Sequence, residues 1–427
     1  MRDLFITLVI FGAVPFILMR PYIGAYVWAW LSYMNPHRLS WGFAYNMPFA
    51  AIVAGMLIIG LFTAKEKNKF PVNIVTIIWL IFIFWLAVST VFAIDVDESM
   101  FEFKRVMKIQ LITLVTLLVI TDKKKLEYLI WAIVASLSFF GVKGGAFVMA
   151  TAGSYRVWGP PDTFIEGNNE LALALLMIIP LMWHLRQQAK NIWLRRIMVV
   201  FILLTLFSII SSYSRGAFLA AGAVLLMFWL KSSKKFVIGI SLVVVVSAVL
   251  AFMPGQYFDR MNTIQNYEED GSALGRINAW YFAFNLAMDR PLTGGGFGTF
   301  TKDLFITYAP DPFDHHDAHS IYFEVLGEQG FIGLAIFLAL WFFTFRLCSK
   351  IIKQTKNSEE LEWANSLAKM VQVGVVAYIV GGAFLGLAYF DLPYHLMIIA
   401  VLCHMFVQKE LDEASNKDTG KSAGDEL

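Results

Sequence analysis

Two arginines are the residues of this sequence best suited to binding an anion. Arg215 stands in IISSYSRGAFLA, between two apolar runs, and Arg276 stands in SALGRINAWYF, near the start of an amphipathic stretch. A guanidinium binds phosphate through two parallel hydrogen bonds and keeps its charge at physiological pH. The two together suit a diphosphate. The competing interpretations are that Arg215 only orients a helical hairpin and that Arg276 is a solvated loop residue.

A polar segment, DPFDHHDAHS, covers residues 311–320 and offers either a metal site or a general base. Histidine and aspartate are ligands for divalent metals, but here they are consecutive on an irregular stretch. An imidazole titrates at about 6.5 and can take a hydroxyl proton at neutral pH. We therefore favour His319 as a base oriented by Asp317, with His315 and His316 solvated, and we predict neither metal nor cofactor.

Four further ionisable residues are auxiliary candidates. Glu324 and Glu328 are four residues apart, hence on one helix face, where they either line a polar cavity or cap and pair with other groups. Asp391 stands in the short turn AYFDLPYH, and Arg156 stands in YRVWGPP. These residues are expected near the site, in supporting positions.

The elements that position these residues are membrane helices, according to the composition. The 427 residues are 58% hydrophobic and 15% charged, whereas soluble domains are about 45–50% apolar and about 25% charged. This excludes soluble enzymes, disordered chains and nucleic-acid binders. The net charge of +2 gives no field that would attract nucleic acid. Cys348 and Cys403 are expected to be small core residues.

Twelve apolar runs approach the length of about 20 residues that a bilayer crossing requires. They cover residues 4–19, 43–63, 72–94, 105–120, 126–150, 169–185, 197–213, 216–230, 236–253, 320–346, 366–388 and 394–408. The run at 22–34 is too short and rich in tyrosine and tryptophan, so we expect it to be interfacial or re-entrant. The predicted fold class is an all-α integral membrane protein with about 12 transmembrane helices and a large loop that contains short helices.

Lysines and arginines orient these helices, because basic loops stay on the cytoplasmic side. If the runs alternate, the basic loops share one side: 65–69, 121–125, 186–196, 231–235 and 346–356. Twelve crossings then place both termini in the cytoplasm. The acidic loop 254–319 lies outside, with a helix at about 275–289 and a glycine-rich turn at 291–300.

The same pattern predicts four regions along the chain. A transmembrane region covers 1–196, a core with the outer loop covers 197–346, and two C-terminal helices fall within 347–408. A polar tail at 409–427 is expected to be disordered. Within the core, Gly327, Gly330 and Gly333 recur every three residues, which favours the close approach of another helix.

The segments SSYSRGAFLA, LGRINAWYFAF with PLTGGGFGTF, and DAHSIYFEVLGEQGFIGL together resemble the O-antigen ligase/polymerase superfamily of membrane glycosyltransferases. The resemblance covers about residues 210–340 and places the two arginines of that family at Arg215 and Arg276 and its histidine at His319. Ser320 stands where the family commonly has asparagine. The N-terminal third, with YRVWGPPDTFIEGNNELALALL, is similar to O-glycosylation ligases associated with exosortase systems.

The resemblance implies a GT-C-like, multi-pass enzyme of the bacterial inner membrane with its active site facing the periplasm. It implies metal-independent, inverting transfer of a glycan from undecaprenyl diphosphate to lipid A–core or to a protein hydroxyl. Arg215 and Arg276 would hold the diphosphate and His319 would deprotonate the acceptor. Membrane lipids are the other expected partners, and nucleic acid is not one.

Two alternatives to a glycan ligase stay open. A polymerase of O-antigen or exopolysaccharide would use the same donor and extend another glycan. A transporter of lipid-linked glycans is less favoured, because transporter halves repeat and carry ionisable residues near the midplane. The aromatic residues Trp158, Trp280, Tyr281 and Tyr322 could stack on a sugar or belong to an interfacial belt.

Overall fold

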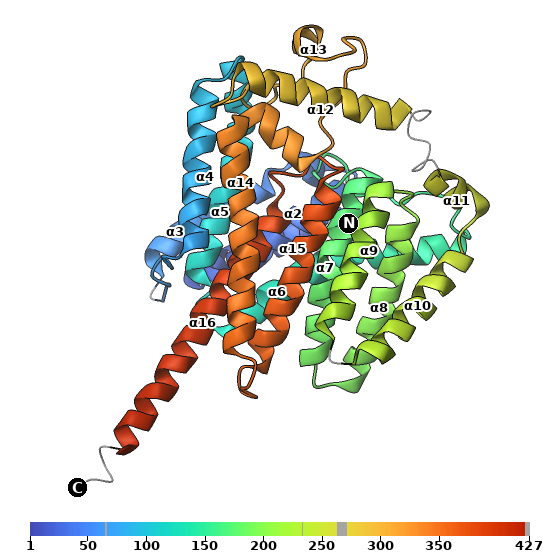
Figure 1. Ribbon diagram of the computed structural model, residues 1–427. Coiled ribbons are helices and arrows are strands. Elements are labelled where there is room, and N and C mark those ends of the chain that lie inside the picture. The colour runs from blue at the N-terminus through green and yellow to red at the C-terminus, as the bar shows by residue number, and fades with distance from the viewer. Residues whose placement is uncertain (65, 233, 263–270, 423–427) are drawn as a thin grey trace.

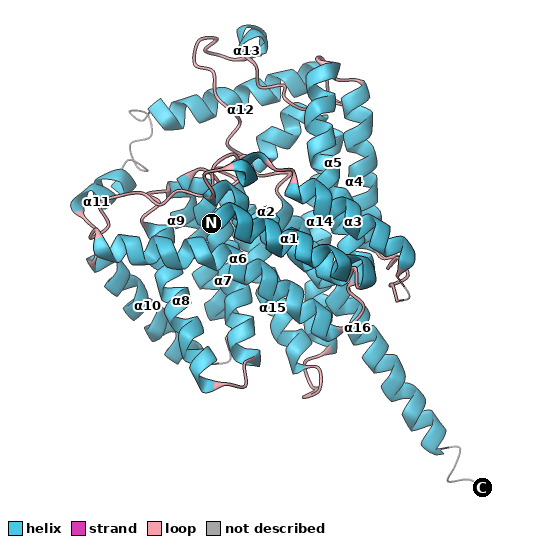
Figure 2. Cartoon of the chain, turned by 180° about the vertical axis from the view of Figure 1, so that it is seen from behind, coloured by secondary structure: helices cyan, strands magenta, loops and turns pink. Residues whose placement is uncertain are grey.

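The computed structural model describes residues 1–64, 66–232, 234–262 and 271–422, and within these ranges it contains helices and no strand (Figures 1 and 2). Lys65 and the end of the expected tail, residues 423–427, lie outside the described residues. Each of the twelve apolar runs corresponds to a helix: α1 (Arg2–Met19), α3 (Phe49–Thr63), α4 (Ile74–Val91), α5 (Val96–Val119), α6 (Lys123–Ala150), α7 (Asn168–Gln188), α8 (Ile192–Ile210), α9 (Arg215–Lys231), α10 (Lys235–Ala251), α14 (Ile321–Gln354), α15 (Glu362–Gly382) and α16 (Asp391–Ser422).

Among the described residues, eight helices are long and apolar enough to cross a membrane: α1, α4, α6, α7, α8, α14, α15 and α16. The other four predicted runs form helices that are shorter or more charged. α3 has 15 residues, and α9 and α10 have 17 each. α5 begins with a charged half, VDESMFEFKR. The all-α membrane class is confirmed.

Local capping explains where several helices begin. Asn73 accepts hydrogen bonds from the amides of Val75 and Thr76 at the start of α4. Asp122 accepts from the Lys125 amide at the start of α6, at 2.8 Å. Such side chains satisfy amides that the first helical turn leaves without partners. At the other end of the chain, α16 continues to Ser422, whereas a disordered tail was expected from residue 409.

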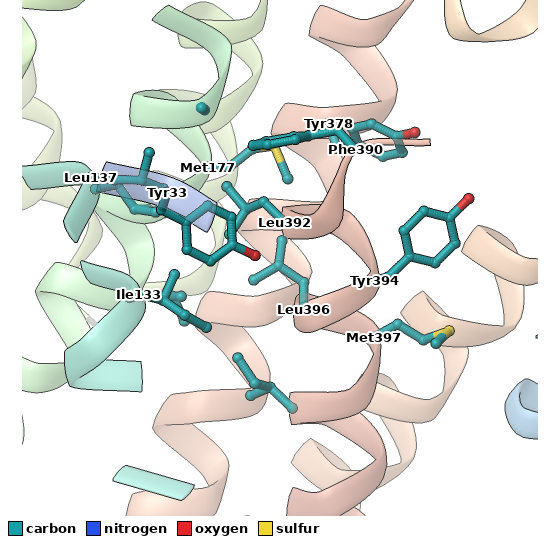
Figure 3. Close-up of a cluster of buried hydrophobic side chains, with 14 of the residues drawn as sticks. Tyr33, Ile133, Leu137, Met177, Tyr378, Phe390, Leu392, Tyr394, Leu396 and Met397 are labelled. Atoms are coloured by element: carbon teal, nitrogen blue, oxygen red, sulfur yellow. The ribbon is translucent and has the colours of Figure 1, made fainter. Parts of the chain in front are cut away.

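The short run at 22–34 forms α2 (Tyr22–Met34), and it lies in the interior of the bundle (Figure 1). Tyr33 of α2 is fully buried, and its hydroxyl lies 2.7 Å from His395 Nδ1 of α16. Figure 3 shows this core, where side chains of α2, α6, α7, α15 and α16 meet. Two short 3-10 turns follow α2, at Pro36–Leu39 and Phe43–Asn46. The piece is therefore a packed helix within the protein.

Small residues bring α6 and α8 into close contact. A Cβ placed on Gly145 of α6 would lie 2.0 Å from the Leu204 carbonyl oxygen of α8, and one on Gly141 would lie 2.5 Å from Thr205 Oγ1. In a membrane, helices associate through such close packing because the lipid supplies no hydrophobic driving force between them. This pair fixes the outer end of α8, and hence the turn that carries Arg215.

The basic loops gather at one end of the bundle, named here the inner end. Lys123 Nζ lies 4.6 Å from the centre of the Trp363 ring, and Ser366 donates a hydrogen bond to Gln187 at 2.6 Å. At the opposite, outer end lie α11 (Gly255–Asn262), α12 (Gly271–Asp289) and α13 (Lys302–Tyr308). α12 runs crosswise over the ends of the long helices (Figures 1 and 2).

The long helix α14 is broken at Gly330, which has φ +68° and ψ −174°. The glycine-rich turn 291–300 docks on this break: the Gly295 amide donates to the Gly327 carbonyl at 2.8 Å, and the Phe331 amide donates to the Pro291 carbonyl at 2.9 Å. The spacing of Gly327, Gly330 and Gly333 had predicted the close approach of another helix. The structure instead places Gly330 in the left-handed region, which favours glycine, and places a loop against it.

Candidate functional site

A polar cavity of about 610 Å³ lies at the outer end, between the start of α9, the start of α12 and the segment before α14. Among the described residues, its lining includes three arginines and one carboxylate. The ionisable lining residues are Arg156, Arg215, Arg276, Asp314, His316 and His319. The structure therefore brings together the two arginines and the histidine that the sequence singled out, and it adds three residues to them.

Arg215 is the first residue of α9, and a tight turn presents it to the cavity. Ser214 caps the helix by accepting a hydrogen bond from the Ala217 amide at 3.1 Å. Tyr213 has φ +57°, and its hydroxyl donates to the Gly153 carbonyl at 2.7 Å. A helix N-terminus carries partial positive charge and amides that point outward. Arg215 adds a full charge at this position, so the local field favours an anion.

Arg156 comes to the same place from the loop between α6 and α7. Its guanidinium carbon lies 5.9 Å from the centre of the Tyr213 ring. The loop is tied to the end of α8, because Ser211 donates to the Tyr155 carbonyl at 2.8 Å. Arg156, ranked as auxiliary from the sequence, therefore lines the cavity beside Arg215.

Arg276 lies in the second turn of α12, next to Gly275, whose missing side chain leaves room for the ring of His316. A Cβ on Gly275 would lie 2.4 Å from the His316 ring. His316 Nε2 in turn lies 2.7 Å from Asp314 Oδ1. His316 was expected to be a solvated loop residue, and its side chain is 43% exposed; in addition it lines the cavity and is paired with a carboxylate.

His319 precedes α14 in a left-handed conformation, with φ +41°. The residue before it is held by α12, because Trp280 Nε1 donates to the Ala318 carbonyl at 2.9 Å while the indole stacks on Phe323 at 5.0 Å. Burial and the Arg276 guanidinium lower the pKa of His319 below its ordinary 6.5, and Asp317 opposes this shift. The neutral, proton-accepting imidazole is thus the prevailing form at neutral pH.

Glu324, which is half-buried, and Glu328, which is buried, both bond to loop segments. Glu324 accepts a hydrogen bond from the Ala388 amide at 3.1 Å. Glu328 accepts from the Gly298 amide at 3.1 Å and from the Tyr389 hydroxyl at 2.7 Å. The amides of Ala388 and Gly298 belong to loops, so these contacts are not helix caps. Neither carboxylate contributes to the lining of the cavity.

Asp391 and Asp317 also lie outside that lining. Asp391 is buried and accepts a hydrogen bond from Ser32 at 2.5 Å, which ties α16 to α2. Asp317 is exposed and acts on His319 through its charge. We find no contact through which Asp391 would reach the cavity within the part of the chain that the structure describes.

The structure also addresses the metal interpretation of residues 311–320. His315 turns away from the cavity, with Nε2 2.8 Å from the Phe300 carbonyl oxygen and its ring 4.9 Å from that of Phe305. Asp314 and His316 remain as a pair. In the described ranges, no three histidine, cysteine, aspartate or glutamate side chains are grouped as metal ligands.

An apolar cavity of about 520 Å³ adjoins the polar one. It is lined by side chains of α7, α8, α9 and α10, among them Ile179, Leu206 and Val245. Ser214 lines both cavities, and the rings of Tyr213 and Tyr257 meet between them at 5.7 Å. The outer end thus joins a cationic chamber to a hydrocarbon-lined one, within a polytopic membrane protein.

Comparison with known families agrees with this architecture. Residues 200–338 match the family model described as O-antigen ligase, in agreement with the resemblance found over about residues 210–340. Residues 1–190 match a family of unknown function (DUF5935). No curated protein matches the sequence. The chain is thus a multi-pass membrane protein with an O-antigen ligase-type enzyme domain.

Proposed function

We propose that this protein transfers a glycan from undecaprenyl diphosphate to an acceptor hydroxyl, with the outer end facing the periplasm. The observation that carries the proposal is the convergence of Arg156, Arg215 and Arg276 with His319 in one cavity. The adjoining apolar cavity supports a donor with a polyprenyl tail, because its mostly hydrocarbon lining can take a lipid chain from the bilayer without exposing that chain to water.

The reaction follows from these groups. The acceptor oxygen attacks the anomeric carbon, the bond from that carbon to the diphosphate oxygen breaks, and His319 takes the hydroxyl proton. Attack from the face opposite the leaving group inverts the anomeric centre. The arginines stabilise the charge that develops on the departing diphosphate, a role that fixed cations perform without reorganisation.

The test is transfer by the purified chain in proteoliposomes that contain a synthetic undecaprenyl-diphosphate glycan. Candidate acceptors are lipid A–core, a peptide with serine and threonine, and a second glycan, and mass spectrometry of the products distinguishes ligase from polymerase. Activity should persist in EDTA. Flux of the donor across sealed vesicles with no transfer product would instead indicate a transporter and would refute the proposal.

Single substitutions assign the roles. Arg215→Ala, Arg276→Ala and His319→Ala should each abolish transfer while the protein still inserts, whereas Arg195→Ala, at an exposed inner-end position, should leave it intact. His316 is the competing base. Loss of transfer in His316→Gln together with full activity of His319→Gln would move the base assignment to His316.

A further inference from the structure

One face of α12 is apolar and exposed, and it forms a single stripe along the helix. Its residues recur at intervals of three and four, which places them on one side of an α-helix. They are Leu274, Ile277, Tyr281, Phe284 and Met288. Tyr281 is 56% exposed and Met288 is 61% exposed, whereas Ile277 is half-buried, so the described part of the chain covers the stripe only in part.

The other faces of α12 have partners. Phe282 packs against Phe305 of α13, with ring centres 4.3 Å apart. Trp280 stacks on Phe323 of α14, and Arg276 turns to the polar cavity. The stripe is therefore the side of the described helix with the least protein cover.

The stripe continues onto the membrane-facing surface of α14. The rings of Phe284 and Phe331 meet edge to face at 6.3 Å. From Phe331, exposed side chains follow α14 down the bundle at Leu338 and Phe342, which are 44% and 57% exposed. In a membrane-spanning helix such a row of exposed apolar side chains faces lipid. The surface that lipid covers on α14 thus extends without a break onto α12.

The direction of α12 agrees with this continuity. The helix runs crosswise over the ends of the long helices (Figure 1), so its axis lies along the plane of a membrane that those helices cross. Helices with an apolar face and this direction rest in the boundary between headgroups and acyl chains. Tyr281 has the amphipathic ring that is enriched at that depth.

We infer that α12 is a membrane-interface helix, whose stripe from Leu274 to Met288 is buried in the outer boundary of the bilayer. Arg276 is carried on the same helix, one residue from Ile277, so it is held at headgroup depth. A diphosphate whose lipid tail stays in the bilayer also lies at this depth. The inference concerns the surface of α12, and only its link to donor binding rests on the proposed function.

Spin labels measure the depth directly in vesicles of phosphatidylethanolamine and phosphatidylglycerol. Labels are placed at Tyr281, Phe284 or Met288, with Cys348 and Cys403 replaced by alanine. Collisions with oxygen should exceed those with nickel ethylenediaminediacetate, as for a label at Leu338. A label at Phe313, which is 96% exposed and lies off the stripe, should show the reverse. Stripe labels as open to the nickel complex as Phe313 would overturn the inference.

A matched pair of substitutions tests the link to the donor. Phe284→Asp places a charge in the stripe, and Phe313→Asp places the same charge elsewhere on the outer end. Because a charge in the stripe opposes the burial of α12 in the bilayer boundary, we expect Phe284→Asp to raise KM for the lipid-linked donor roughly tenfold. Phe313→Asp should change nothing. The label measurement needs no transfer, so absence of activity would count against the proposed function alone.

Discussion

Replacing Trp280 by phenylalanine tests whether α12 positions His319. The indole Nε1 donates to the Ala318 carbonyl at 2.9 Å, and the ring lies 5.0 Å from that of Phe323 at an interplanar angle of 8°. Phenylalanine keeps an aromatic ring against Phe323 and removes the donor. Ala318 is 2% exposed, so its carbonyl has little access to water as a substitute partner.

The expected effect follows from the value of that hydrogen bond. A buried group left without its partner costs about 1–3 kcal/mol, and each 1.4 kcal/mol in a barrier corresponds to about tenfold in rate. The segment that holds His319 loses this restraint, whereas the arginines keep their contacts. We therefore expect kcat to fall roughly tenfold with little change in KM for the donor.

The assay is release of undecaprenyl diphosphate in proteoliposomes at saturating acceptor, measured over a range of pH. Trp41→Phe is the matched control, because Trp41 is 91% exposed and does not line the cavity. Thermal unfolding in detergent establishes that both variants are folded. A normal kcat for Trp280→Phe at every pH, in a protein that unfolds like the wild type, would refute the positioning role.

Three further predictions concern the base, the anion site and the kink. Because the pKa of His319 is lowered, its neutral form persists at neutral pH, and kcat/KM should fall only as the pH drops below 6.5; a decline that begins above pH 7 would contradict the base assignment. Arg215→Lys keeps the charge and loses the two-pronged geometry, so donor affinity should fall roughly tenfold in a binding titration, and unchanged affinity would argue against phosphate contact. In Gly330→Ala, the new Cβ would lie 2.4 Å from the Leu292 carbonyl oxygen at φ +68°. Its free energy of unfolding should drop by about 3 kcal/mol or more, while Gly222→Ala, with open space around it, should be neutral; equal stability of the two would refute this account of the kink.

The helices could be predicted from the sequence because the length of an apolar run is a local property. Each of the twelve apolar runs forms a helix in the structure. Asn73 and Asp122, whose side chains can accept hydrogen bonds from backbone amides, stand at two of the helix starts. The charged half of α5 and the short α2 show the limit of this reasoning. Length decides whether a helix can cross a bilayer, but packing decides that α2 lies inside the bundle.

The site could be predicted only in part, for a related reason. Arg215, Arg276 and His319 were brought together by the resemblance of three separated segments. The Asp314–His316 pair was missed, because a polar stretch without regular spacing does not show which side chains turn inward. Its signal was the small residue Gly275 on α12, whose meaning depends on a contact some 40 residues away along the chain.

The hydrogen-bond partners of the auxiliary carboxylates could not be predicted, because they lie far away along the chain. The spacing of Glu324 and Glu328 correctly put them on one helix face, but their hydrogen-bond partners lie at residues 298, 388 and 389. Asp391 meets Ser32, at a separation of 359 residues. A buried carboxylate near a candidate site has the same appearance in a sequence whether it binds a substrate or an amide.

The hydrogen bonds between the turn 291–300 and the break in α14 at Gly330 bear on how the cavity can change width. The turn 291–300 continues directly from α12 and is bonded to both sides of Gly330, and Trp280 of α12 is bonded to Ala318, so the helix that bears Arg276 is tied at two places to the segment that bears His319 and to α14. Arg215 belongs to α9, outside these tied segments. If the cavity changes width, we therefore expect the change to lie between Arg215 and the other two residues, with the distance from Arg276 to His319 kept.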